Sequence, residues 1–429
     1  MARLLMLKTK KPIYRQRVMQ EEKKNLGIAI VGLGGAVATT AVAGSLLIQK
    51  GLQDKTGLPL AEFENLDLTA YENIKFNGWD IFDENLYDCA IHHAVLNNEE
   101  LAAIKKDLQD ITPWQAIANK DFCSGVTDNK VNSNTLMDQV KVIQDNIKSF
   151  SDEIDAPVIV INLASTEHAV DVTDPIFQTI EAFEKALDDC SKKISPAMLY
   201  AYAAISVGSP YGNFTPSMAV DVPALIDFAA KKGVPVAGKD GKTGQTFVKT
   251  VVAPALRARA LKVDGWFSTN ILGNRDGQAL AKPESLQSKI NTKGSVLDSC
   301  LNYKVENHMV QIHYYKPRGD DKEAWDNIDF TGFLGQKMQM KINFLCKDSI
   351  LAAPLVIEIA RCLELAARRN EGGPVEALSV FFKAPLTANN EEPEHRFAIQ
   401  QQRLIEWLHE DSASSEASKA SAQEEKSLV

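Results

Sequence analysis

Lysine and aspartate side chains gather between residues 273 and 322 in a pattern suited to proton transfer and anion binding. The span holds Gly273-Asn-Arg-Asp-Gly277, then Ser288-Lys-Ile-Asn-Thr-Lys293, then Gly319-Asp-Asp-Lys322. If residues 288–293 are helical, Lys289 and Lys293 share one face, where like charges repel by roughly 0.2–0.5 kcal/mol unless an anion lies near them. The span therefore predicts an active site that binds a phosphate or another oxyanion. The alternative is a pair of solvated surface lysines.

The composition is that of an ordinary globular protein. The 429 residues are 45% hydrophobic and 24% charged, which is enough for two or three domains. A net charge of -9 provides no basic face for nucleic acid, so we expect no nucleic-acid partner, and local charge must bind any anionic ligand. The longest apolar run, residues 27–48, contains glycines and threonines that favour strand, turn and helix over a membrane span.

Cysteine usage and the basic start of the chain indicate a cytoplasmic protein. The cysteines at 89, 123, 190, 300, 346 and 362 show no C-x-x-C spacing, which predicts free thiols in a reducing compartment. Residues 1–24 are basic but are not followed by a short apolar core and cleavage site, so no signal peptide is expected.

A glycine turn follows the first apolar run. Leu26 to Val31 predicts a strand, Gly32-Leu-Gly-Gly35 a turn, and residues 36–49 a helix. Such a turn lets the backbone approach a pyrophosphate, and the helix N-terminus offers free N–H groups. The alternative is a glycine turn that binds no nucleotide. No acid lies about twenty residues further on; Asp80 comes later, in residues 76–81, which we predict as a strand end and loop.

Three further apolar runs predict a parallel sheet. Strands are expected over residues 158–163, 201–207 and 234–237, each ending in small or polar residues, with helices at about 176–190 and 222–232 between them. Helical spacing also marks residues 96–109 and 134–149 as covering helices. Ligands of such sheets bind beyond the carboxyl ends of the strands.

A second anion site is predicted where Asp240-Gly-Lys-Thr-Gly-Gln-Thr246 opens a helix that runs through residues 247–261. The Gly-Lys-Thr sequence is not a P-loop, because that motif needs a glycine at 236, where Val stands.

The pattern then changes to alternating strands at residues 266–272, 308–315 and 338–344, which predicts an antiparallel sheet with one open face suited to subunit contact. Asp348, a candidate N-cap, leads into a helix through Ala367 that rejoins the first domain. Lys383 lies in an apolar setting and is either snorkelling or functional. Residues 411–429 have the composition of a disordered tail.

These patterns predict an α/β protein. A Rossmann-type doubly wound parallel sheet is joined to an α+β domain with an open, mostly antiparallel sheet suited to subunit contact. The expected division is a basic segment (1–25), a parallel-sheet domain (26–262), an antiparallel-sheet domain (263–346), a segment returning to the first domain (347–410) and the tail (411–429).

Taken together, the motifs resemble those of the myo-inositol-1-phosphate synthase family. The resemblance spans about residues 26–385, and it rests on the order and spacing of the glycine turn, Asn162-Leu-Ala-Ser-Thr-Glu167, Gly208-Ser-Pro, residues 238–246 and the lysine-rich motifs above. It implies an NAD-dependent isomerase that converts D-glucose 6-phosphate to 1D-myo-inositol 3-phosphate. The implied steps are oxidation at C5 by NAD+, enolisation, aldol closure of C6 onto C1, and reduction by NADH. It also implies a homotetramer, in which residues 26–262 form the NAD-binding domain and residues 263–346 form the catalytic and tetramerisation (oligomerisation) domain.

The resemblance further implies roles for individual residues. The catalytic set is Lys289, Lys293, Lys322, Lys383, Asp240, Asp276, Asp320 and Asp348. The NAD-binding set is Gly32, Gly34, Gly35, Asp80, Ala164, Thr166, Gly208, Asp240, Asn274, Asp276 and Ser349. The substrate phosphate set is Thr243, Gly244, Gln245, Asn274 and Lys293. Positioned ammonium groups would stabilise alkoxide and enolate oxygens, and lysines crowded by other cations can exchange protons.

The chain departs from the family pattern at several places. Ala36-Val-Ala38 stands where asparagines are frequent, Val207 and Arg275 replace asparagines, and Lys239 replaces an aspartate. Two alternatives remain at this point, a two-domain dehydrogenase of a phosphorylated sugar and a catalytically silent NAD-binding scaffold. His168 is the nearest candidate for a dehydrogenase histidine, though a structural role is more common for such a residue. The acids are too dispersed to define metal or monovalent-cation ligands.

Overall fold

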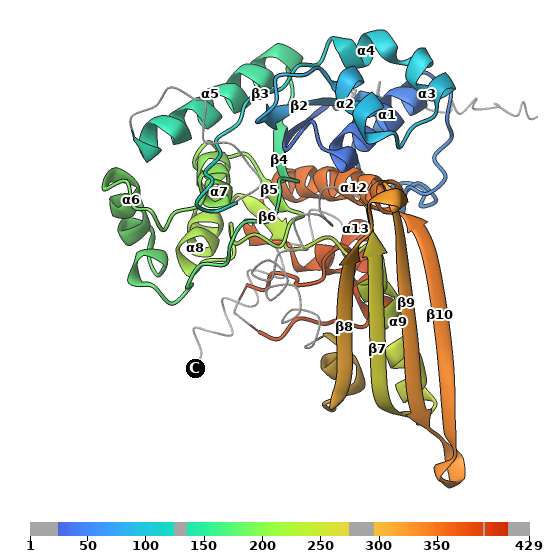
Figure 1. Ribbon diagram of the computed structural model, residues 1–429. Coiled ribbons are helices and arrows are strands. Elements are labelled where there is room, and N and C mark those ends of the chain that lie inside the picture. The colour runs from blue at the N-terminus through green and yellow to red at the C-terminus, as the bar shows by residue number, and fades with distance from the viewer. Residues whose placement is uncertain (1–24, 124–134, 274–295, 389–390, 411–429) are drawn as a thin grey trace, which may run out of the picture.

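The computed structural model describes residues 25–123, 135–273, 296–388 and 391–410. These ranges form two sheets with helices, and the second sheet projects from the rest of the molecule as a long blade (Figure 1). Both parts of the predicted fold class are confirmed. In the described ranges, no helix is long and apolar enough to cross a membrane.

The first sheet has the strand order β11-β6-β5-β4-β1-β2-β3, and each neighbouring pair is parallel. Its strands are β1 (Leu26–Val31), β2 (Ile74–Asp80), β3 (Trp114–Gln115), β4 (Val158–Asn162), β5 (Tyr211–Asn213), β6 (Pro235–Gly238) and β11 (Gly373–Pro374). The order reverses beside β1, so the carboxyl ends of β1 and β4 form the crevice where such sheets bind ligands.

Helices cover both faces of this sheet, because side chains of each strand point alternately to opposite faces. Ile28 and Ile30 pack against one helical layer, whereas Ala29 and Val31 pack against the other. The first layer contains α1 (Ala36–Gln49), α2 (Leu86–His93), α3 (Asn98–Ala103), α4 (Lys105–Gln109), α12 (Asp348–Arg368) and α13 (Phe397–His409). The second contains α5 (Leu136–Ile154), α6 (Ile180–Asp188), α7 (Pro196–Ser206) and α8 (Pro223–Lys232).

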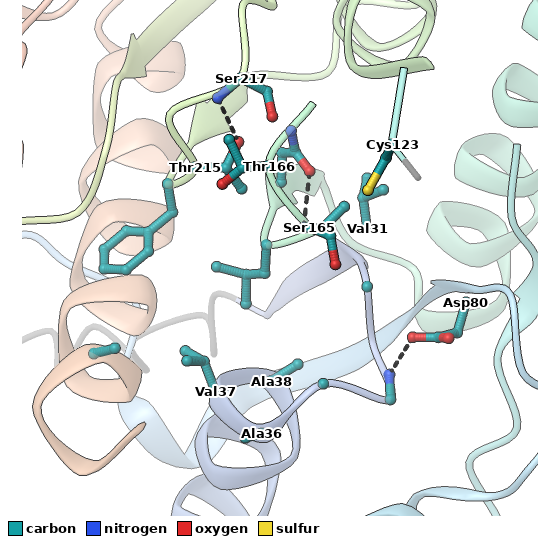
Figure 2. Close-up of a pocket in the computed structure, with 18 of the residues that line it drawn as sticks. Val31, Ala36, Val37, Ala38, Asp80, Cys123, Ser165, Thr166, Thr215 and Ser217 are labelled. Atoms are coloured by element: carbon teal, nitrogen blue, oxygen red, sulfur yellow. Dashed lines mark hydrogen bonds between the residues drawn. The ribbon is translucent and has the colours of Figure 1, made fainter. Parts of the chain in front are cut away.

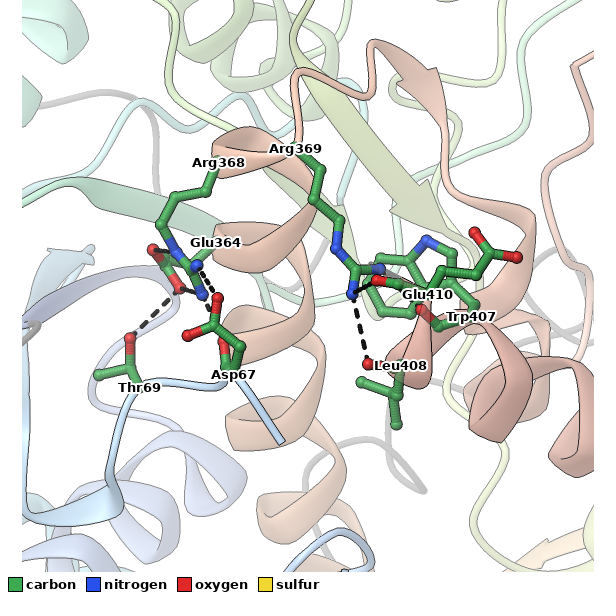
Figure 3. Close-up of polar contacts among 8 residues, drawn as sticks. All are labelled: Asp67, Thr69, Glu364, Arg368, Arg369, Trp407, Leu408 and Glu410. Carbon is green, nitrogen blue, oxygen red and sulfur yellow. Dashed lines mark hydrogen bonds and ion pairs between the residues drawn. The ribbon is translucent and has the colours of Figure 1, made fainter. Parts of the chain in front are cut away.

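The end of α12 is fastened by two arginines (Figure 3). Arg368 binds Glu364 on the same helix and Asp67 on the loop before β2, both at 2.5 Å. Arg369 donates to the carbonyl of Trp407 at 2.7 Å and so holds α13. The helices α12 and α13 therefore pack in the core of the first sheet.

The second sheet has the order β10-β9-β7-β8, with β7 antiparallel to β9, β9 antiparallel to β10, and β7 parallel to β8. The strands are β7 (Lys262–Leu272), β8 (Asn307–Tyr314), β9 (Asp321–Thr331) and β10 (Lys337–Lys347), and α9 (Gln245–Ala258) packs on one face. Short 3-10 turns complete the chain at Tyr71–Asn73, Pro175–Phe177, Lys316–Arg318, Phe333–Gly335 and Glu376–Phe381.

Several predicted elements differ from the structure. The expected strand at residues 201–207 is wrong, because this run belongs to α7, which begins with the N-cap Ser195 and Pro196 and is buried on all sides. The strand comes later, as β5. Strand β9 was missed, and the helix expected at 96–109 is broken at Ile104, whose φ of -120° is not helical. Asp348 is the first residue of α12 and Lys347 is its N-cap, so the predicted N-cap role is wrong.

Candidate active site

A cavity of about 610 Å³ lies where the carboxyl edge of the first sheet meets the base of the second sheet. The last residues of β1, β2 and β4 line it, and so do the loops that follow these strands and the loops that follow β5 and β6. The second sheet supplies the turn between β8 and β9, and the N-terminus of α12 and Lys383 close the chamber. Segments far apart in sequence therefore meet at one place, as the parallel topology requires.

The glycine turn after β1 forms one wall (Figure 2). Gly32 has a φ of +87°, a conformation that favours glycine, and its N–H donates to the Trp79 carbonyl at 2.8 Å. The N–H of Gly34 donates to Asp80 Oδ2 at 2.8 Å. A Cβ on Gly34 would lie 3.1 Å from that oxygen, so a side chain there would require a small shift of Asp80.

Asp80 ends β2 and lines the cavity. Residues 76–81 are thus mostly strand, and the insertion of residues 51–73 explains why the acid comes late in the sequence. Its two oxygens accept the N–H groups of Gly34 and Phe82. The second strand of a dinucleotide-binding sheet commonly places an acid at this position to bind a ribose.

Two lysine–aspartate pairs line the same cavity as the glycine turn. Lys322 Nζ lies 3.1 Å from Asp348 Oδ1, and Lys383 Nζ lies 2.7 Å from Asp240 Oδ1. All four side chains are largely buried and line the cavity. Because each ammonium is paired with a carboxylate, the chamber can hold positive charge without an excess of repulsion.

Asp320 is the third carboxylate of this wall. It accepts the hydroxyl of Ser349 at 2.6 Å and the main-chain N–H of the same residue. Burial raises the pKa of Asp320, and the hydrogen bonds from Ser349 partly oppose that rise. Ser349 and Asp320, which the sequence placed in different sets, thus form one unit at the N-terminus of α12.

The comparisons with known proteins identify the family. A family model described as myo-inositol-1-phosphate synthase, an NAD-binding model, matches residues 58–409. The chain is 39% identical over 406 residues to inositol-3-phosphate synthase 1 of Bacteroides thetaiotaomicron, covering 89% of this chain and 94% of the relative. This chain belongs to the myo-inositol-1-phosphate synthase family. Inositol-3-phosphate synthase of Dictyostelium discoideum is 30% identical, with 83% of this chain and 78% of the relative covered.

The structural comparison agrees with this family. A crystal structure of inositol-3-phosphate synthase from Caenorhabditis elegans superposes with a TM-score of 0.84 at 26% identity, covering 90% of this chain and 86% of that chain. A synthase-related protein from Thermotoga maritima, with a TM-score of 0.74 at 24% identity, shares the fold. The resemblance inferred from the sequence motifs is confirmed.

The residues present fit NAD, the cofactor of this family. Helix α1 begins after Gly35 without a side-chain cap, so the N–H groups of its first turn face the cavity end of β1. Beyond β4, Ala164 and Thr166 line the same chamber, and the Ala164 N–H is held by Asn162 Oδ1 at 3.1 Å. The predicted cofactor residues Gly32, Gly34, Gly35, Asp80, Ala164, Thr166, Asp240 and Ser349 all line the cavity.

One predicted cofactor residue does not lie there. Gly208 occupies the turn between α7 and β5, at the end of the first sheet opposite the cavity, and has a φ of +82°. This left-handed conformation after the helix explains why glycine stands at position 208. Asn274, Asp276, Lys289 and Lys293 lie outside the described residues, as does Arg275.

The predicted phosphate turn lies beside Lys322. Thr243 lines the cavity, and a Cβ built on Gly244 would lie 4.0 Å from Lys322 Nζ. Gln245 begins α9, but its side chain is bonded to Asn270 within the second sheet. Lys242 is also turned away, toward Gln400, which agrees with the rejection of a P-loop.

Sequence reasoning missed several residues of the cavity wall. His93 Nε2 donates to the Gly34 carbonyl at 2.8 Å, and Tyr200 accepts the N–H of Ile117 at 2.8 Å. Glu167 Oε1 accepts the N–H of Ala197 at 3.0 Å, whereas its buried Oε2 has no hydrogen-bond partner within the described ranges. Glu167 could have been found, since it follows the polar end of a predicted strand; the other two come from helices whose contacts are set by the tertiary fold.

The described part of the chain contains no group of three or more His, Cys, Asp or Glu side chains that could hold a metal ion.

Proposed function

We propose that this chain converts D-glucose 6-phosphate to 1D-myo-inositol 3-phosphate with NAD as a cofactor that is regenerated in each turnover. The observation that carries this proposal is that the glycine turn and the Lys322–Asp348 and Lys383–Asp240 pairs line the same cavity. Membership of the family gives the reaction. The contacts around the cavity support proposed roles for its residues in cofactor binding, catalysis and phosphate binding.

Bound NAD supplies a hydride acceptor that becomes the hydride donor at the end of the same cycle. The glycine turn and the first turn of α1 would hold its pyrophosphate, and Asp80 would bind a ribose hydroxyl. Ala164, Thr166 and Ser349 would line the rest of the cofactor site.

Lys322 and Lys383 would act on the substrate. Negative charge develops on sugar oxygens during oxidation, enolisation and ring closure, and fixed ammonium groups in a water-poor chamber stabilise such charge strongly. Asp348 and Asp240 hold these ammonium groups in place. We place Lys289, Lys293 and Asp276 in the same set by their position in the family pattern, with Asp320 orienting the N-terminus of α12 through Ser349.

The substrate phosphate would bind at the start of α9. Thr243, Gly244 and the main-chain N–H of Gln245 form an uncapped helix N-terminus beside the Lys322 ammonium, which suits an anion. Asn274 and Lys293 would complete this site.

The two sheets belong to units with different proposed functions. We propose that residues 26–262 and 347–410 form the NAD-binding unit, and that residues 263–346 form the catalytic unit.

The test is a reaction of purified protein with glucose 6-phosphate and NAD+ far below the substrate concentration. The proposal predicts that inositol phosphate forms in many turnovers per NAD+ without net accumulation of NADH. A dehydrogenase would convert NAD+ stoichiometrically to NADH, and a silent scaffold would yield neither compound; either result would overturn the proposal.

We propose that a second copy covers the outer face of the second sheet, the face opposite α9. Four apolar side chains lie on it, Phe267, Met309, Trp325 and Leu345, and the last three are exposed by 54%, 42% and 58%. A homotetramer would bury this face. Light scattering should give four chains per particle, and Trp325→Glu should lower that number; a monomeric wild-type protein would contradict the assembly.

We also propose a cytoplasmic location. The six cysteines form no disulfide, and free thiols are typical of a reducing compartment.

A further inference from the structure

A buried carboxylate lies behind the proposed phosphate site, outside the cavity wall. Asp326, in the middle of β9, is fully buried. Its Oδ1 accepts the indole N–H of Trp266 at 2.7 Å and the hydroxyl of Ser268 at 2.6 Å. Its Oδ2 faces the side-chain amide of Gln245, with Nε2 at 3.5 Å. A carboxylate held this far from water is costly unless its partners are fixed.

Gln245 is fixed at both ends of its amide group. Its Oε1 accepts the Nδ2–H of Asn270 at 2.7 Å, while its Nε2 faces Asp326. An amide oxygen accepts and an amide nitrogen donates, so only one orientation of this side chain satisfies both neighbours. The side chain is therefore committed to the second sheet, and Gln245 offers the substrate side only its main-chain N–H.

Lys249 anchors the next turn of the same helix. It lies four residues after Gln245, on the same face of α9, and is 1% exposed. Its Nζ lies 2.7 Å from His308 Nε2 on β8. Burial lowers the pKa of Lys249 to about 8, and the negative charge of Asp326 opposes that fall. Asp326 thus interacts with α9 at two successive turns, through the Gln245 amide at the first and through the charge of Lys249 at the second.

Strand β9 links this network to the catalytic lysine. Lys322 and Asp326 lie four residues apart on β9, so both side chains leave the same face of the strand. Strand β9 therefore contacts the start of α9 at two points. Lys322 lies beside Gly244, which directly precedes α9, and Asp326 contacts Gln245, the first residue of α9.

We propose that Asp326 is a positioning residue for substrate phosphate: through Gln245 it fixes the first turn of α9, so that the main-chain N–H groups of this turn stay aimed at the phosphate beside Lys322. The inference rests on the proposed function, because that function places the phosphate there. Asp326 itself touches neither substrate nor cofactor.

The test compares Asp326→Asn with Ser268→Ala. The asparagine retains one oxygen for Trp266 and Ser268 but turns its NH2 toward the NH2 of Gln245, so the amide orientation is lost. We expect KM for glucose 6-phosphate to rise about tenfold to hundredfold, the worth of one hydrogen bond to a charged group, with kcat changed much less. Ser268→Ala removes one donor from Oδ1 without touching Gln245, so its KM should stay at the wild-type value.

Calorimetry with glucose 6-phosphate and with NAD+ on the same variants gives a second readout. Asp326→Asn should weaken binding of the sugar phosphate and leave NAD+ affinity unchanged. Asn270→Ala, which frees the other end of the Gln245 amide, should weaken sugar phosphate binding in the same direction and serves as the second variant should Asp326→Asn not fold.

Wild-type KM and binding in folded Asp326→Asn, or in Asn270→Ala if the first variant is unfolded, would overturn the inference. A rise in KM for Ser268→Ala equal to that of Asp326→Asn would also overturn it, because the effect would then be general to the sheet. Failure of the proposed function would give a different result from failure of this inference. In that case wild-type protein would bind glucose 6-phosphate but form no inositol phosphate.

Discussion

The Glu167 carboxyl should make this protein less stable as the pH rises from about 4.5 to about 7. The Oε1 of Glu167 accepts a hydrogen bond from the Ala197 N–H, and its Oε2 has no partner among the described residues. Burial raises the pKa of Glu167 to about 7 from its usual 4.5, although hydrogen bonds from Ser195 and Ala197 work against the rise. The folded protein therefore holds a proton at pH values where the unfolded chain has lost it.

The magnitude follows from the two pKa values. Each tenfold change in a proton equilibrium corresponds to about 1.4 kcal/mol, so the shift costs at most about 3 kcal/mol of folding stability above pH 7. Below pH 4.5 both states are protonated and the cost vanishes. Stability is thus lost between pH 4.5 and 7, which is the sign expected for a raised carboxyl pKa.

Glu167→Gln keeps an oxygen for the Ala197 N–H and cannot ionise. The variant should be more stable than wild type at pH 8 by up to about 3 kcal/mol, and the advantage should shrink toward zero at pH 5. Urea unfolding at both pH values measures it, with Glu64→Gln, a change at an exposed glutamate, as the matched control. An equal difference at pH 5 and pH 8, or a variant less stable than wild type at pH 8, would refute the reasoning.

Three further variants test other parts of the structure. Lys383→Met leaves Asp240 without its ammonium partner, and turnover should fall by about 10²–10³ while calorimetry still detects NAD+ binding. Burial lowers the pKa of Lys242 to about 7, so wild-type stability should rise between pH 7 and 10.5 by at most about 5 kcal/mol, and chemical unfolding of Lys242→Met should lack that rise. Arg361→Met leaves the fully buried Glu358 uncompensated and should cost about 3–5 kcal/mol in urea unfolding, most of it recovered by adding Glu358→Gln.

Each of these has a clear contrary result. Full turnover by Lys383→Met would remove that lysine from the catalytic set. Parallel pH profiles for wild type and Lys242→Met would show that the buried amine does not titrate in this range. A double variant no more stable than Arg361→Met alone would mean that the loss arises from packing and not from an unpaired charge.

Local signals made the glycine-turn wall of the cavity predictable. The run from Leu26 to Val31 is uniformly apolar and ends at glycines, a pattern that only a buried strand and a tight turn satisfy together. The ends of β4 and β6 were found in the same way. Lys383 could be singled out because a lysine within an apolar run needs a partner, and the structure supplies Asp240.

The remaining elements depended on tertiary packing. The run from Ala201 to Val207 is apolar except at Ser206, so neither a period of two nor one of 3.6 distinguishes strand from helix, and the helix is fixed by burial on all sides. Strand β9 was not predicted from the sequence, because Asp326 occupies an inward position where the alternating pattern calls for an apolar residue. This exception is the residue that we propose positions the start of α9, and function can override a local sequence rule at such a residue.

The most direct test of the account follows the hydride itself. Glucose 6-phosphate carrying deuterium at C5 is converted by the purified protein with NAD+ present far below the substrate concentration. If the same chamber removes and returns this hydride, the inositol phosphate retains the deuterium and no reduced cofactor accumulates. Loss of the label from the product, or a build-up of deuterated NADH in solution, would contradict the closed cycle that the cavity is proposed to carry out.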